Sequence, residues 1–177
     1  MKYFESQLLG GDVFPDENTI LFYGGIFSQW ADCEYSVDIG HVRERVNCAE
    51  QAMMLYKAHI FRDMDTYMQI LNADHPRDQK MLGRLVKGFD PQEWDKVAFD
   101  FVAKSNYEKF SQNASWRELL LLTGKYELVE ASPTDRIWGI GYGVSHYAFA
   151  ERAKWGTNLL GKAIMDARTR LLIELEK

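Results

Sequence analysis

The spacing of apolar residues along the chain changes near residue 47. Before this point, β-forming residues occur in short runs, which predict strands at Thr19–Tyr23 and Tyr35–Ile39, and Gly24 and Gly25 end the first run. From residue 47 onward, apolar residues recur every three or four positions, which is the period of an amphipathic helix. The pattern therefore predicts a small N-terminal β element followed by a mainly helical region.

Polar caps, prolines and glycines divide the helical region into separate helices. We expect these helices at 48–61, 63–71, 77–86, 90–110 and 115–122, and a C-terminal one in which Leu159, Ala163, Ala167 and Leu171 share a face. Asp90 and Pro91 mark the clearest helix start, because aspartate caps free N–H groups and proline fits the first turn. Asn47 and Glu50 fit a capping box at the first helix.

The remaining pattern bears on the fold class. A brief strand is expected at 128–131, ahead of a glycine-rich loop. No regular alternation of strand and helix is visible, which argues against a parallel sheet. We therefore predict an α+β fold that is mainly α with a small β element.

The composition is that of a folded protein with one domain. The chain has 177 residues, of which 46% are hydrophobic and 27% are charged, and it contains no repeat or linker-like segment. We expect a single domain over residues 1–177. No apolar run reaches the roughly 20 residues of a membrane helix, and the N-terminus lacks the order of a signal peptide. These features favour a cytoplasmic protein that does not associate with a membrane.

Cysteine, histidine and charge exclude some kinds of function. Cys33 and Cys48 form no CxxC pair and are expected to be reduced core residues, and the four histidines lack metal-ligand spacing. We expect neither a metal nor a cofactor. The net charge of -5 argues against non-specific binding to duplex DNA as the main activity, but a nucleic acid can still be held locally. Aromatic residues make up 14% of the chain and could stack on a base, although most are expected in the core.

Glu50 and Lys57 form the first candidate site. They lie two turns apart on the first predicted helix, so they share a face, with Cα atoms about 10 Å apart along the helix axis. Both side chains are long enough to reach one bound ligand. The alternative is structural: a capping acid and a solvated lysine.

The second candidate site is the segment from Asp135 to Gly143. Its glycines would let backbone N–H groups face a diphosphate, and Trp138 would stack on a base or sugar. Asp135 would hold ribose hydroxyls or transfer a proton. These glycines do not follow a strand that opens a βαβ unit, so we reject a dinucleotide oxidoreductase.

A third feature is a row of basic residues at helical spacing, which could meet a phosphate backbone. The favoured interpretation is a solvated face near Asp74 and Asp78. The basic residues are Arg77, Lys80, Arg84 and Lys87.

Five segments, taken in this order, resemble the NADAR family, which includes the YbiA-like N-glycosidases. They are AEQAMMLYKAHIF (49–61), LGRLVKGFDPQEWD (82–95), KFSQN (109–113), LLLTGKYELVEASPTDRIWGIG (120–141) and WGTNLLGKAIMDAR (155–168). Residues 27–30 resemble the family's Ser-Asn-Phe segment, with Gln29 in place of asparagine and Trp30 in place of phenylalanine. The order of the motifs carries the resemblance more than any one of them.

The resemblance implies a nucleotide ligand of the ADP-ribose type and hydrolysis of an N-glycosidic bond. We favour removal of ADP-ribose from guanine in DNA. Two alternatives stay open: cleavage of phosphoribosylated intermediates of riboflavin synthesis, and a non-catalytic ADP-ribose-binding module.

The resemblance also implies roles for individual residues. Lys57 is expected to attack the anomeric carbon and form a Schiff base, Glu50 to move protons or stabilise the developing cation, and Asp135 to hold ribose hydroxyls. The expected ligand-binding residues are Phe22, Gly24, Ser28, Trp30, Trp94, Arg136, Trp138, Gly139, Gly141 and Asn158.

Overall fold

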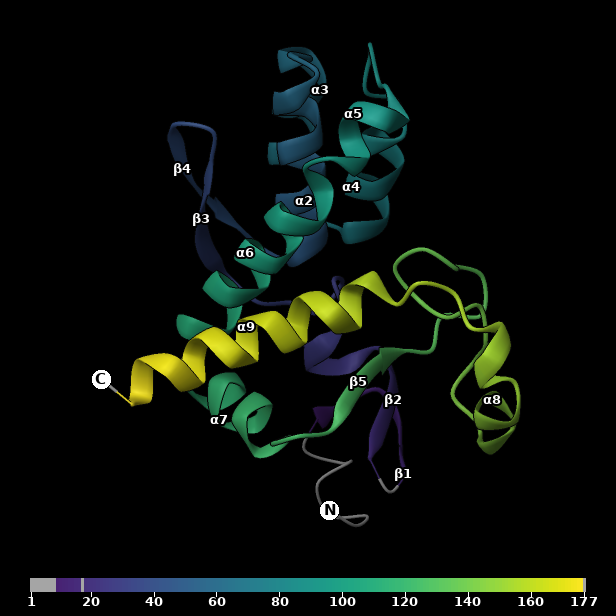
Figure 1. The fold of residues 1–177 in the computed structure, drawn as a ribbon. Coiled ribbons are helices and arrows are strands. Elements are labelled where there is room, and N and C mark those ends of the chain that lie inside the picture. The colour runs from purple at the N-terminus through teal and green to yellow at the C-terminus, as the bar shows by residue number, and fades with distance from the viewer. Residues whose placement is uncertain (1–8, 17, 177) are drawn as a thin grey trace.

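The computed structural model describes residues 9–16 and 18–176, and its β structure consists of a three-stranded sheet and a separate hairpin (Figure 1). In the sheet, β1 (Asp12–Asp16) pairs antiparallel with β2 (Thr19–Tyr23), which pairs parallel with β5 (Glu127–Glu130). The hairpin joins β3 (Tyr35–Ile39) to β4 (Val42–Val46). Both predicted N-terminal strands are confirmed. The expectation that parallel pairing is absent is wrong, because β5 returns to β2 after more than a hundred residues rather than through one crossover helix.

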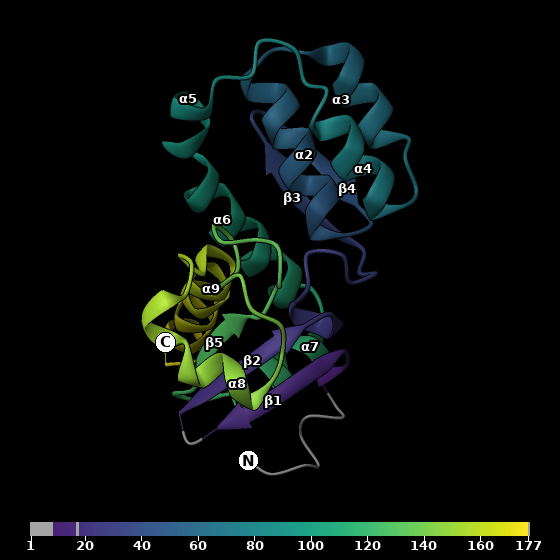
Figure 2. The ribbon, with the colours of Figure 1, turned by 90° about the vertical axis from the view of Figure 1, so that its right-hand side faces the viewer.

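Three helices pack together with the hairpin in one part of the molecule (Figures 1 and 2). They are α2 (Ala49–Ile60), α3 (Met64–Leu71) and α4 (Pro76–Gly83). The first two agree with the predicted helices. The third ends at Gly83, three residues before the predicted end at Val86.

The capping box expected at the start of α2 is not formed. Cys48 is the N-cap, and its Sγ accepts a hydrogen bond from the Gln51 N–H at 3.4 Å. The side chain of Asn47 instead donates to Asp74 O at 2.9 Å, and that of Glu50 accepts from Trp30 Nε1 at 3.2 Å. Because the Cys48 side chain caps a free N–H group at the start of the helix, the Glu50 carboxyl has no capping role.

The long helix predicted from Asp90 to Phe110 is two helices, α5 (Pro91–Asp95) and α6 (Ala98–Ser111). The Asp90 cap is confirmed, since its side chain accepts from the Gln92 N–H at 2.8 Å. The break falls at Lys96 and Val97, where the Val97 N–H bonds to Trp94 O in a tighter turn. Trp94 stays buried beside this break, with its ring centroid 6.2 Å from that of Tyr56 on α2.

The main core lies where α6 meets the C-terminal helix α9 (Leu159–Leu175), which also packs on β5 and on α7 (Ala114–Leu122). The predicted helices at 115–122 and at the C-terminus are thereby confirmed. A smaller apolar cluster covers the other face of the sheet beneath α8 (His146–Ala150). Two short 3-10 helices, η1 (Gly25–Phe27) and η2 (Arg152–Lys154), complete the described elements.

The alternation of β2 explains the two apolar clusters. Ile20 and Phe22 point into the main core, while Leu21 joins the smaller cluster. Over residues 9–16 and 18–176, the structure contains no helix with the length and hydropathy needed to cross a bilayer. Cys33 and Cys48 are both free and buried, as predicted.

Candidate active site

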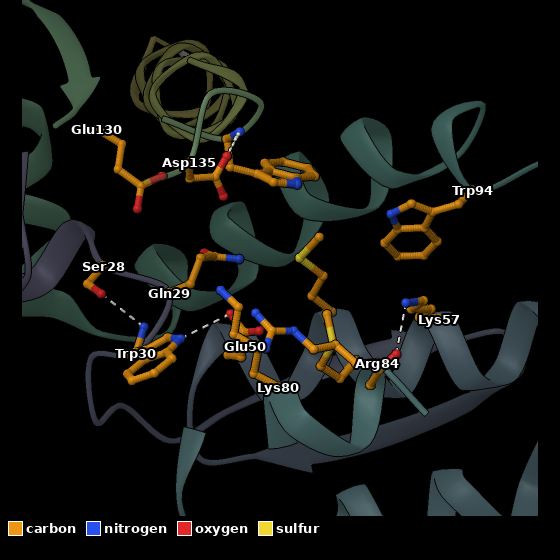
Figure 3. A pocket seen from close by; sticks show the side chains of 14 residues that line it. Ser28, Gln29, Trp30, Glu50, Lys57, Lys80, Arg84, Trp94, Glu130 and Asp135 are labelled. Atoms are coloured by element: carbon orange, nitrogen blue, oxygen red, sulfur yellow. Dashed lines mark hydrogen bonds between the residues drawn. The ribbon is translucent and has the colours of Figure 1, made fainter. Parts of the chain in front are cut away.

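A cavity of about 230 Å³ opens between α2, α4, α5 and the loop that follows β5 (Figure 3). Helix α2 forms one wall with Glu50, Met53, Met54 and Lys57. The predicted convergence of Glu50 and Lys57 on one space is therefore found, with the two methionines between them. Figure 3 shows Glu130 and Asp135 on the side of the cavity opposite Glu50.

Glu50 is almost fully buried at the N-terminal end of α2, with 4% of its surface exposed. Its carboxylate accepts a hydrogen bond from Trp30 Nε1 at 3.2 Å. Burial raises the pKa of Glu50, and this outweighs the opposing effects of Lys80, Trp30 and Arg84. A carboxyl in this environment holds a proton more readily than an exposed glutamate and can pass it to a ligand.

Lys57 lies at the other end of the same wall. Its Nζ donates to the Gly83 carbonyl at 2.8 Å and lies 3.8 Å from the centroid of the Phe89 ring. Burial, and then the nearby charge of Arg84, lower the pKa of Lys57. No carboxylate of the described residues forms an ion pair with it. The amine is thus more easily deprotonated, and so more nucleophilic, than a solvated lysine.

The opposite wall is acidic and comes from the end of β5 and the loop after it. Asp135 Oδ1 accepts the N–H groups of Ile137 and Trp138, both at 2.8 Å, which fixes the turn that carries it. Burial raises the pKa of Glu130 to about 7; the negative charges of Asp135 and Glu50 add to this, while Lys80 opposes it. Glu130 was not among the predicted site residues.

The cavity continues into an outer groove of about 1040 Å³. The two spaces share walls, including Lys80 and Arg84, and the groove extends to Arg77 and Arg136. Three members of the predicted basic row therefore line one groove. The fourth, Lys87, lies beyond the end of α4, and its Nζ is 3.6 Å from the Asp65 carboxylate.

Nine of the thirteen predicted site residues lie at these spaces. Seven line the cavity: Ser28, Trp30, Glu50, Lys57, Trp94, Asp135 and Trp138. Gly24 and Arg136 line the groove.

The other four predicted residues have structural positions instead. Phe22 is fully buried, with its ring centroid 5.2 Å from that of Phe27. Gly139 and Gly141 allow close packing, and the expectation that the loop glycines bind a diphosphate stays a prediction. A Cβ at Gly139 would lie 2.9 Å from Glu130 O, and Gly141 has a φ of +78°.

Asn158 is the fourth of these residues, and it positions the acidic wall. Its Oδ1 accepts the Glu130 N–H at 3.0 Å, and its Nδ2 donates to Leu128 O at 2.9 Å. With a φ of 53° it begins α9 in the left-handed region, which asparagine tolerates better than most residues. The side chain therefore ties α9 to the strand that delivers Glu130.

Two further residues at the site were missed. Glu130 ends a short strand and precedes a loop, which is the only signal that could have indicated it. Gln29 lines the cavity, and the backbone carbonyl of its neighbour Ser28 accepts a 2.9 Å bond from Lys109, a fully buried lysine on α6. No local pattern predicts that contact. Within the described ranges, no group of three or more His, Cys, Asp or Glu side chains is placed to hold a metal.

Comparison with known proteins gives a consistent result. Residues 21–172 match the model of the NADAR domain. The chain is 42% identical over 145 residues to N-glycosidase R617 of Acanthamoeba polyphaga mimivirus, covering 81% of this chain and 85% of that protein. It is 36% identical over 99 residues to an N-glycosidase of Nostoc punctiforme, covering 56% of this chain and 57% of the relative.

A solved structure shares the fold. The NMR structure of Escherichia coli YbiA superposes with a TM-score of 0.74 at 27% identity, covering 93% of this chain and 90% of that one. The family model spans most of the chain, including both walls of the cavity. The protein therefore belongs to the NADAR family.

Proposed function

We propose that this protein is an N-glycosidase, a hydrolase that cleaves the bond between a base and a ribose, and that its substrate is ADP-ribosylated guanine in DNA. The observation that carries the proposal is the position of Lys57. Its amine, with a lowered pKa and no carboxylate partner among the described residues, opens into the same cavity as Glu50, Glu130 and Asp135. The two relatives named N-glycosidases support the same type of reaction.

In the proposed reaction, the neutral Lys57 amine attacks the anomeric carbon. The carbon–nitrogen bond to the base breaks, and the base leaves with the bonding electrons and a proton from a carboxyl group, for which Glu50 is placed. The lysine nitrogen then loses a proton, and its lone pair forms the carbon–nitrogen double bond as the bond to the ring oxygen breaks. The ring oxygen takes up a proton, and the opened ribose is held as a protonated Schiff base. Water adds to the Schiff base, releases the sugar and restores the amine. Asp135 holds the ribose hydroxyls.

The size of the site supports a substrate larger than a nucleoside. The inner cavity, at about 230 Å³, is smaller than the roughly 300 to 1,000 Å³ of most small-molecule pockets, whereas the groove reaches about 1040 Å³. A base and its ribose would occupy the cavity. The phosphates would extend into the groove, where Arg77, Lys80 and Arg84 offer positive charge despite the acidic total of the chain.

Two alternatives make different predictions in one assay. A hydrolase of phosphoribosylated riboflavin intermediates would turn over the free nucleotide but not an ADP-ribosylated oligonucleotide. A binding module would turn over neither. Incubation with a defined ADP-ribosylated oligonucleotide and with the free intermediate, followed by chromatography of the released base or sugar, separates the three cases.

The mechanism is tested by reducing the Schiff base. Borohydride added during turnover should leave a ribosyl adduct on Lys57, located by peptide mass spectrometry. Lys57→Ala should abolish both the adduct and hydrolysis, and Lys57→Arg should also fail because a guanidinium stays protonated. Lys162→Arg, on the exposed side of α9, is the matched control. Normal turnover by Lys57→Arg would reject covalent catalysis and favour a water activated by Glu50.

A further inference from the structure

The side-chain nitrogen of Gln29 is a buried donor at the edge of the cavity. Gln29 Nε2 has no acceptor within the described part of the chain, and Figure 3 shows it pointing into the cavity. An unpaired buried donor is rare, because the group has given up its hydrogen bonds to water without replacement. A donor of this kind at the wall of a ligand site indicates a ligand atom that accepts from it.

The orientation of the Gln29 amide follows from its neighbours. Asn106 Nδ2 lies 2.9 Å from Val102 O, which can only accept, so the Asn106 atom there is the donor nitrogen. The same nitrogen lies 3.2 Å from the Gln29 side chain. Gln29 must therefore present its oxygen to Asn106, and Nε2 is left facing the cavity.

The backbone around Gln29 is also held in place. The Gln29 carbonyl accepts from the Glu50 N–H at 2.9 Å, and the Ser28 carbonyl accepts from Lys109 Nζ at 2.9 Å. The segment is thus tied to both α2 and α6 before any ligand arrives. A donor fixed in advance loses little conformational freedom when it binds, and it can discriminate between ligands that differ by one acceptor.

The chemistry of the surrounding side chains limits what the acceptor can be. Glu50, Glu130 and Asp135 line the same cavity and are acceptors when ionised. Their charge disfavours a phosphate at this position, whereas a neutral carbonyl oxygen carries no such penalty. We infer that Gln29 Nε2 donates a hydrogen bond to a carbonyl oxygen of the base, and that Gln29 selects for bases that carry one. The inference rests on the proposed function, since it places the base in this cavity.

Two nucleotides that differ at the base carbonyl test the inference. Guanosine 5′-monophosphate carries the carbonyl and a proton on the adjacent ring nitrogen. In 2-aminopurine riboside 5′-monophosphate, hydrogen replaces the carbonyl oxygen and the adjacent ring nitrogen has no proton. Titration calorimetry should give the wild type about 10-fold tighter binding of the guanine nucleotide, which is the effect of one neutral hydrogen bond. Gln29→Met has a similar length but no donor, and it should lose most of this preference. Gln69→Met, an exposed glutamine on α3, should keep the wild-type ratio.

Asn106→Leu is a second variant that leaves Gln29 in place but no longer orients its amide. It should lose part of the preference, and it keeps the test informative if Gln29→Met does not fold. Equal affinity of the wild type for the two nucleotides, no detectable binding of either, or an unchanged ratio in folded Gln29→Met would overturn the inference. Turnover of the ADP-ribosylated oligonucleotide by the wild type is measured separately, so failure of the proposed function is recognised independently.

Discussion

Replacing Lys109 by methionine should change how the stability of the protein depends on pH. Lys109 is fully buried in α6, and its Nζ donates to Ser28 O at 2.9 Å and lies 5.2 Å from the Phe110 ring. Burial lowers the pKa of Lys109 from 10.5 to about 8. Methionine fills a similar volume without a charge, so the substitution removes this titration together with the hydrogen bond to Ser28 O.

The magnitude follows from the difference between the two pKa values. Between about pH 8 and 10.5 the unfolded chain keeps the proton on Lys109 while the folded protein has lost it. The unfolded state then binds more protons, so the free energy of unfolding rises with pH. At about 1.36 kcal/mol for each pKa unit, the wild type should gain roughly 2.5 kcal/mol over Lys109→Met between pH 7 and pH 10.

Urea denaturation of both proteins at pH 7, 8, 9 and 10 measures this gain. The comparison stops at pH 10 because burial raises the pKa of the Cys48 thiol to about 11. The charge of this thiol also acts on Lys109. Lys162→Met controls for the loss of one exposed positive charge. Stability curves of the wild type and Lys109→Met that stay parallel across this range would refute the argument, because the buried amine would then keep its proton in the folded protein.

Three further predictions concern the cavity and the groove. Arg84→Glu should weaken binding of the ADP-ribosylated oligonucleotide and make the binding less dependent on salt. Lys87→Glu, which lies outside the groove, should do neither. Equal effects of the two substitutions in fluorescence anisotropy would exclude the groove as the DNA site. Trp138→Ala should weaken ADP-ribose binding by about 1 to 3 kcal/mol in calorimetry, because a stacking surface is lost. Its circular dichroism spectrum should stay native, and loss of that spectrum would show that Trp138 is a core residue. Glu130 lines the groove that is proposed to hold the phosphates, and above its pKa of about 7 it adds a negative charge there. The value of kcat/KM should therefore fall as pH rises through 7, and Glu130→Gln should remove that fall. A variant with the wild-type profile would show that another group titrates.

Local patterns predicted the helices well and the pairing of strands poorly. The cap at Asp90 and the apolar face of 159–171 depend on neighbouring residues, and both were identified correctly. The parallel partnership of β2 and β5 depends on residues far apart in the sequence, which no short window contains. The break after α5 was missed for a similar reason, because Lys96 and Val97 are compatible with a continuous helix.

The same distinction applies to the site. The shared face of Glu50 and Lys57 follows from helix periodicity alone. The position of Glu130 depends on β5 pairing with β2 and on Asn158 bonding to the β5 backbone. The glycines after Asp135 suggested phosphate binding, but a glycine that allows two segments to pack closely has the same appearance in a sequence.

The pairing of β2 with β5 determines when the site can form as the chain is synthesised. Thr19 lies opposite Glu127, so the sheet closes only after more than a hundred further residues have left the ribosome. Helix α2 packs against α3, α4 and α6, which all precede β5 in the chain, so Glu50 and Lys57 can take their places before the sheet closes. The acidic wall also waits for Asn158, whose bonds to β5 come from the start of the last helix. Nascent chains that stop before this point carry Lys57 without the facing carboxylates. On the proposed mechanism, the amine therefore becomes competent for hydrolysis only after the start of α9 has been synthesised.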